Sequence, residues 1–91
     1  MSKTIKTKNK FEVVYYMSYG LTIQSVTFHK EKGKIIPEFE ISGETLSEMS
    51  SRYQLGRAVI SLTELEGNLN KLEELIKNEL DLFMEDNGNE G

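Results

Sequence analysis

Cysteine is absent from the 91-residue sequence, and proline and histidine each occur once. Without cysteine the chain has no disulfide bond, zinc–thiolate site or thiol nucleophile, so packing alone must hold the fold together. No apolar run approaches the roughly 18 residues of a membrane span, and the basic start MSKTIKTKNK is not followed by the apolar stretch of a signal peptide. We therefore expect a cytoplasmic protein that does not bind membranes.

The side chains that usually carry catalysis are few. His29 has neither a second histidine nor a cysteine with which to share a metal ion, and this shortage favours a structural role. The hydroxyls of Ser47, Ser50 and Ser51 have no histidine near them in the sequence to activate them. The sequence also lacks a glycine-rich phosphate loop. We therefore expect no enzyme, with no catalytic residues, metal, cofactor or small-molecule substrate.

Charge is divided unevenly along the chain. Residues 1–36 contain seven lysines and two glutamates, whereas residues 37–91 contain four basic and thirteen acidic residues. An acidic half can present a face to a basic partner, imitate the charge of a nucleic acid, or simply keep the protein soluble. The sequence leaves these alternatives open.

The first nine residues alternate lysine with threonine and show no apolar periodicity, so we expect residues 1–9 to form a flexible basic arm. A helix is predicted next, with Asn9 as its N-cap and Gly20 in the left-handed position after its end. Phe11, Val14, Tyr15 and Tyr19 gather on one side, and Val13, Tyr16 and Met17 widen the apolar surface nearly all round. We therefore expect this helix to be mostly buried.

Two extended segments follow, Leu21 to Phe28 and Ile35 to Ile41, joined by a polar turn in which Gly33 can take a positive φ. The apolar alternation of the first segment slips by one residue, which predicts a β-bulge near Gln24 and Ser25. Pro37 has no N–H to donate. The second strand is therefore expected either at a sheet edge or paired only on the side that does not use that N–H.

A second helix is predicted from Ser42 or Thr45 to Gly56, and Arg57 to Ser61 forms either a short third strand or an extended connector. The capping-box pattern Ser-Leu-Thr-Glu at residues 61–64 begins a long final helix. The sequence thus predicts an α+β fold in the order helix, β-hairpin, helix, short strand or connector, long helix. It predicts one domain over residues 10–85 and a disordered tail over residues 86–91.

The last predicted helix carries the strongest pattern in the sequence. Apolar residues recur every three or four positions at Leu62, Leu65, Leu69, Leu72, Ile76 and Phe83, and Leu75, Leu80 and Leu82 widen this side. A helix of about 20 residues is about 30 Å long, so its distal end either projects or folds back over the same small core. The sequence leaves both arrangements open. For self-association or contact with another protein, we expect the residues Leu69, Leu72, Ile76, Leu80, Leu82 and Phe83.

An alternative function uses the basic residues. The predicted arm supplies Lys3, Lys6, Lys8 and Lys10, the hairpin turn supplies Lys30, Lys32 and Lys34, and such clusters attract the phosphates of nucleic acids. The tyrosines that would stack on bases are needed in the core of the first helix, and an acidic second half repels a polyanion. The sequence therefore ranks nucleic-acid binding below protein binding.

The helix ending YYMSYGL, the hairpin ending PEFEISG, the helix ending RYQLGRA and the segment VISLTEL occur in this order before a long helix. Over residues 9–78 this order resembles small domains of unknown function encoded by phages and prophages of Gram-positive bacteria. Tyr53, Gly56 and Val59 follow the pattern, whereas the extension beyond Ile76 and the acidic tail depart from it. The resemblance implies a phage accessory protein of the bacterial cytoplasm that binds host machinery, including host defence complexes.

A chain of this size can cover about 800 Å² of a partner but rarely builds a buried active site. We therefore expect a non-enzymatic phage accessory protein that binds a protein partner, as a stoichiometric inhibitor or a nucleic-acid mimic. It is expected to self-associate through its C-terminal helix. The alternative is a small nucleic-acid-binding regulator that uses the basic arm and the hairpin turn.

Overall fold

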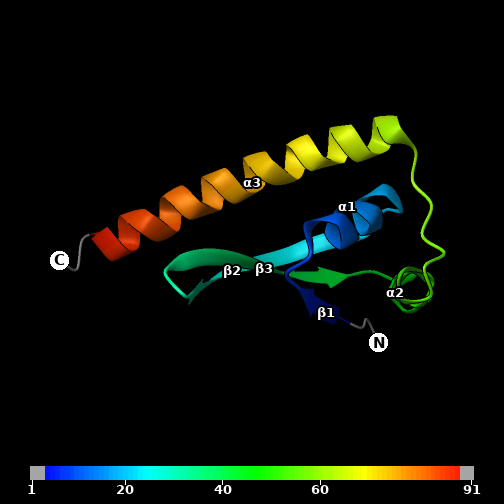
Figure 1. Cartoon of the computed structure of the whole chain (residues 1–91), viewed down its shortest axis with the longest axis horizontal. Coiled ribbons are helices and arrows are strands. Elements are labelled where there is room, and N and C mark those ends of the chain that lie inside the picture. Colours follow the sequence, from blue (N-terminus) through cyan, green and yellow to red (C-terminus); the bar gives the residue numbers. More distant parts are fainter. Residues whose placement is uncertain (1–3, 89–91) are drawn as a thin grey trace.

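Strands and helices form two layers (Figure 1). The computed structural model describes residues 4–88, and the side chains of residues 4–85. The elements in chain order are β1 (Thr4–Thr7), α1 (Lys10–Ser18), β2 (Thr22–Glu31), β3 (Lys34–Ser42), α2 (Leu46–Gln54) and α3 (Leu62–Gly88). The strands form an antiparallel sheet in the order β1-β3-β2, and α1 and α3 lie on one side of it. The predicted α+β class is confirmed, and residues 57–61 form a connector with no strand.

β1 takes the place of the expected flexible arm. Thr4–Thr7 pairs with the central strand β3, with Ile5 opposite Ile41 and Thr7 opposite Phe39. Ile5 packs against the core, while its neighbours Thr4 and Lys6 face away from the helices, because successive side chains of a strand point to opposite faces. The prediction of a loose arm is therefore wrong for the strand residues. Residues 86–88 of the predicted tail belong to α3, so the expectation of disorder is wrong there. Lys3 and residues 89–91 of the tail lie outside the described residues.

α1 lies at the centre of the core, and residues 12–16 are all buried. Asn9 caps the helix as predicted, since its side-chain oxygen accepts hydrogen bonds from the backbone N–H groups of Phe11 and Glu12. The predicted buried face is partly wrong, because Phe11 and Tyr19 are 61% and 41% exposed. The predicted burial of the rest of the helix is confirmed, since Val13, Val14, Tyr15 and Tyr16 are all at most 2% exposed.

A buried polar network joins β1 to α1. The carboxylate of Glu12 is 7% exposed and accepts hydrogen bonds from Tyr16 Oη at 2.6 Å and from Thr7 Oγ1 at 2.8 Å. Glu12 lies in the first turn of α1, where the positive end of the helix dipole stabilises its charge. Burial, and then the hydrogen bond to Glu12, raise the pKa of the Tyr16 hydroxyl above its usual value. This network holds the N-terminal strand against the helix.

The β2–β3 hairpin is formed as predicted. Its two turn residues, Lys32 and Gly33, have φ angles of 50° and 78°, which are those of a type I′ turn. The register shifts by one residue between Ile23 and Ser25, at the predicted bulge. β3 is the central strand, but β1 ends opposite Phe39, so at Pro37 the strand is paired on the β2 side only. Of the two predicted alternatives for Pro37, the structure shows pairing only on the side that does not use its missing N–H.

Glycines end the first two helices as predicted. Gly20 and Gly56 have φ angles of 80° and 71°, which are left-handed conformations that other residues rarely adopt. After α2 the connector leads to α3, whose first turn is capped by Ser61, because Ser61 Oγ accepts a hydrogen bond of 3.1 Å from the backbone N–H of Glu64. The connector carries α3 back across the molecule to lie beside α1 (Figure 1).

Candidate interaction surface

The first half of α3 packs on α1. Leu72 is fully buried, and Leu65 and Leu69 are partly buried against the same core. Asn68 adds a polar contact, since its Nδ2 donates a hydrogen bond of 2.8 Å to Ser18 Oγ at the end of α1. This half of the helix therefore uses its apolar side to complete the core of its own chain.

The second half of α3 lies over the hairpin. The ring centroids of Phe83 and Phe28 are 5.3 Å apart with the planes tilted by 41°, a geometry that aromatic pairs favour. Ile76 packs against the core and Leu80 is half-buried. The distal end of α3 thus folds back over the hairpin, but only one side of the helix contacts it.

The residues predicted for self-association are separated by this arrangement. Leu72 is in the core, and Leu69 and Ile76 pack against it, which corrects their expected place on a free surface, because the core of the same chain covers them. Leu80 and Phe83 are half-buried, and Leu82 is 57% exposed. Sequence reasoning missed Met84, which is 53% exposed, because Met84 falls outside the regular apolar repeat. We call Leu82 and Met84 the distal apolar pair.

A hollow of about 420 Å³ lies next to Leu82. It is formed between β2 and α3, and its lining consists of Val26, Thr27, Phe28, Glu79, Leu82 and Phe83. Aromatic and aliphatic groups make most of this lining, with one carboxylate at its wall. The hollow and the distal apolar pair together form the candidate interaction surface.

A second set of exposed apolar side chains lies at the opposite end of α3. Leu55, Val59 and Leu62, on and around the connector, are 65%, 71% and 69% exposed. The connector is held to α1 there, because Tyr19 Oη donates a hydrogen bond of 2.7 Å to the backbone oxygen of Val59. Leu55 lines a pocket of about 450 Å³ whose other lining residues, Glu48, Ser51, Arg52 and Arg57, are polar or charged, unlike the mainly apolar hollow beside Leu82.

The predicted nucleic-acid contacts do not form one basic surface. On the side of the sheet away from α1 and α3, Lys6 is opposite Glu40, and Lys8 Nζ lies 2.8 Å from a carboxylate oxygen of Glu31. His29 Nε2 lies 3.1 Å from Glu38 on the same side. Basic and acidic groups therefore alternate, which weakens the attraction of a polyanion. The remaining described lysines of the predicted set are exposed at the start of α1 and around the hairpin turn, namely Lys10, Lys30, Lys32 and Lys34.

The Lys8–Glu31 pair joins the end of β1 to the hairpin. The hydrogen bond between them raises the pKa of the Lys8 ammonium and lowers the pKa of the Glu31 carboxyl. Both side chains are exposed, and exposed ion pairs contribute little to stability because water and salt screen them. The pair does place a lysine of the predicted arm beside the hairpin, which the sequence had treated as a separate basic region.

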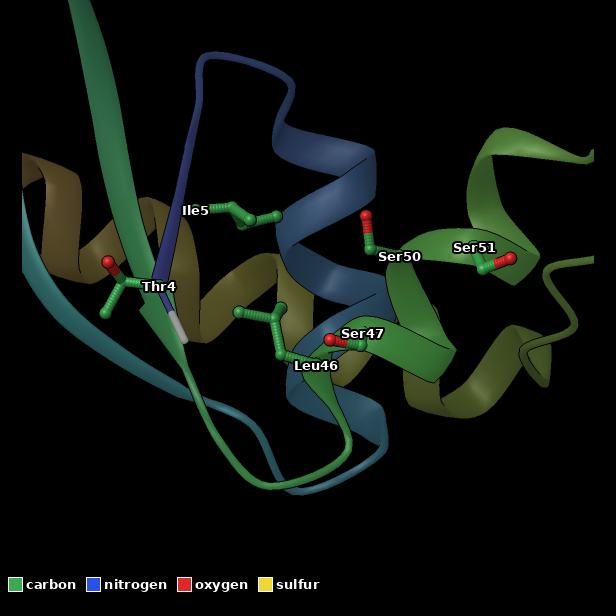
Figure 2. Close-up of a pocket in the computed structure, with 6 residues that line it drawn as sticks. All are labelled: Thr4, Ile5, Leu46, Ser47, Ser50 and Ser51. Carbon is green, nitrogen blue, oxygen red and sulfur yellow. The ribbon is translucent and has the colours of Figure 1, made fainter. Parts of the chain in front are cut away.

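A shallow pocket of about 490 Å³ opens between β1 and α2 (Figure 2). Thr4 and Ile5 line it from β1, and Leu46, Ser47, Ser50 and Ser51 line it from α2. His29 lies on β2, and its ring contacts Glu38, so these hydroxyls do not have this histidine as a base. The pocket therefore gathers the predicted serines without the partner that nucleophilic catalysis needs.

Comparisons with known proteins give no information about the function. No protein-family model, no curated protein and no solved structure matches the chain. Within residues 4–88 no helix is long and apolar enough to cross a membrane. In that same part of the chain, no group of three or more histidine, aspartate or glutamate side chains is arranged to hold a metal ion.

Proposed function

We propose that the protein is a non-enzymatic binding module whose partner is a protein, and that it self-associates through the distal end of α3. The observation that carries the proposal is the exposed Leu82, which lines a hollow formed mainly by apolar groups, together with the exposed Met84 two residues further along α3. Exposed apolar side chains that border a concave, apolar surface are typical of sites where another polypeptide binds.

Protein is favoured over nucleic acid by the charges. Lys6 of β1 and Lys8 just after it lie beside glutamates of the sheet. Tyr15 and Tyr16, which would otherwise stack on bases, are buried. The resemblance to phage-encoded domains supports a bacterial host protein as the partner, bound stoichiometrically in the cytoplasm. The acidic surface of α3 suits a basic site on such a partner.

Mass measurement of variants tests self-association. We expect light scattering to give twice the 10.4 kDa chain mass for the wild type. The double variant Leu82→Glu and Met84→Glu should give the mass of one chain, because two carboxylates would have to be buried on association. The matched control, Leu55→Glu with Val59→Glu, changes two somewhat more exposed apolar side chains at the other end of α3 and should remain a dimer. Equal masses for the two double variants would contradict the proposed surface.

A further inference from the structure

β2 has an open edge along its length. In the sheet order β1-β3-β2 it is the outermost strand, and within residues 4–88 it pairs with β3 alone. The opposite edge is less suited to pairing, because β1 covers only part of β3 and Pro37 removes an N–H just beyond the end of β1. The open edge of β2 is therefore the place where this sheet can be extended by another strand.

The register shows which backbone groups face outwards. In a two-residue hairpin the flanking residues, here Glu31 and Lys34, exchange both hydrogen bonds, and hydrogen-bonded pairs then alternate along the ladder. Counted from the turn, the non-hydrogen-bonded pairs of β2 with β3 are those of Val26, Phe28 and Lys30. Their N–H and C=O groups therefore point away from β3, to the open edge.

The hollow of the candidate interaction surface lies along this edge. Thr27, with its neighbours on β2, forms one wall, and Glu79 and Leu82 of α3 form the other. A groove between an edge strand and a helix offers an added strand both backbone hydrogen bonds and apolar contacts, as strand-addition sites do. Because Leu82 borders the groove, an added strand would also cover part of the distal apolar pair.

Charge indicates what occupies the groove. Lys30, Lys32 and Lys34 surround the hairpin turn, whereas α3 has seven acidic residues and two lysines between residues 62 and 85. α3 runs in the same direction as β2, since Asn68 contacts the end of α1 and Phe83 contacts Phe28. A second copy of β2, laid antiparallel in the groove, therefore brings its basic turn beside the acidic helix.

We infer that two copies join by antiparallel pairing of their β2 strands, with Phe28 opposite its own symmetry mate and Val26 opposite Lys30. This inference rests on the proposed self-association and specifies its geometry. Within one copy, Phe28 lies at the level of Phe83. Val26 is two strand residues earlier, which is about 7 Å or about four to five helical residues, so it lies at the level of Glu79. Lys30 of the second copy, opposite Val26, therefore reaches Glu79 of the first. The sheet becomes continuous across six strands.

Amide hydrogen exchange tests the pairing in the wild-type protein. We expect the N–H groups of Val26, Phe28 and Lys30 to exchange rapidly at low protein concentration and at least about tenfold more slowly when the dimer forms. The N–H groups of Thr27 and His29, which face β3, should be protected at both concentrations. A dimer in which the three outward N–H groups stay unprotected would overturn the inference while leaving self-association through α3 intact. A monomer at all concentrations would overturn both and would leave the groove to a strand from another protein.

A charge exchange tests the predicted register. Lys30→Glu should weaken the dimer by about tenfold, because it sets two carboxylates against each other, and Lys30→Glu with Glu79→Lys should restore it. Lys10→Glu, an equal change of charge on α1, is the control and should have little effect. A double variant no tighter than Lys30→Glu alone would overturn this register.

Discussion

The ring of Phe83, close to the C-terminal end of α3, lies 5.3 Å from the ring of Phe28 on β2. This contact fixes the distal half of a long helix onto the hairpin and sets which side of that half faces solvent. With Phe83 turned inward, Leu82 and Met84 fall to the outside. The packing of Phe83 on Phe28 therefore determines which residues form the candidate interaction surface. The contribution of this contact to the free energy of unfolding can be measured.

Phe83→Ala should lower the free energy of unfolding by about 1–3 kcal/mol, less than a fully buried phenylalanine would cost, because Phe83 is only half-buried. Leu82→Ala should change it by no more than about 0.5 kcal/mol, since this side chain is exposed within one chain. Urea unfolding at low protein concentration measures both. A larger loss for Leu82→Ala than for Phe83→Ala would show that the helix is rotated relative to the structure described above.

The buried network at β1 predicts an alkaline limit to stability. Burial raises the pKa of Tyr16 above the usual tyrosine value, so the unfolded chain loses this proton at a lower pH than the folded chain. The resulting contribution to stability is complete below about pH 10 and declines as the pH rises further, by up to about 1.4 kcal/mol per pH unit.

Tyr16→Phe should reduce this alkaline decline while lowering stability at neutral pH by about 1–3 kcal/mol, because Glu12 loses a hydrogen-bond donor in a buried position. Denaturant unfolding at several pH values from about 8 to about 11 provides the measurement, because this range brackets the usual tyrosine pKa of about 10. Tyr19→Phe, whose hydroxyl bonds the exposed connector, serves as the control. An identical alkaline decline in wild type and Tyr16→Phe would contradict the role given to burial.

Gly43 lies where the chain passes close to Leu21. A Cβ at this position would be 2.1 Å from Leu21 Cδ2, and the φ angle of 156° is one that other residues rarely adopt. Gly43→Ala should therefore destabilise the fold by about 1–3 kcal/mol. Gly67→Ala, in α3 with no atom within 4 Å of the added Cβ, should instead stabilise it by about 0.5–1 kcal/mol. Thermal unfolding of the two variants should move the midpoint in opposite directions.

The alternation of charges on the sheet predicts weak binding to nucleic acid. We expect the protein to pass through a DNA or RNA column at about 0.15 M salt, a concentration that screens scattered exposed charges. Retention that falls steeply with rising salt, and that is lost in Lys32→Glu with Lys34→Glu, would instead support the nucleic-acid alternative.

Local signals in the sequence were sufficient for the hairpin and the helix ends. The bulge at Gln24, the positive φ of Gly33 and the capping by Asn9 and Ser61 each depend on residues a few positions apart, so they are legible without a fold. β1 was not legible, because Thr4–Thr7 becomes a strand only beside β3, more than thirty residues away in the sequence. A short polar strand carries no periodicity of its own.

The candidate site was predictable in part. The repeat of leucines located the apolar side of α3, but the repeat alone does not say which members meet α1 and which meet solvent. Leu72 and Leu82 both belong to the predicted apolar side, yet one is fully buried and the other is 57% exposed, because the contact of Phe83 with Phe28 turns Leu82 outward. The hollow beside Leu82 depends on the position of β2, which no local pattern specifies.

Sedimentation of the wild-type protein over a range of concentrations tests the central claim most directly. The account predicts a reversible change from one chain of 10.4 kDa to two as concentration rises, and the loss of this change in Leu82→Glu with Met84→Glu. A wild-type protein that sediments as a single chain at every concentration would contradict self-association through α3.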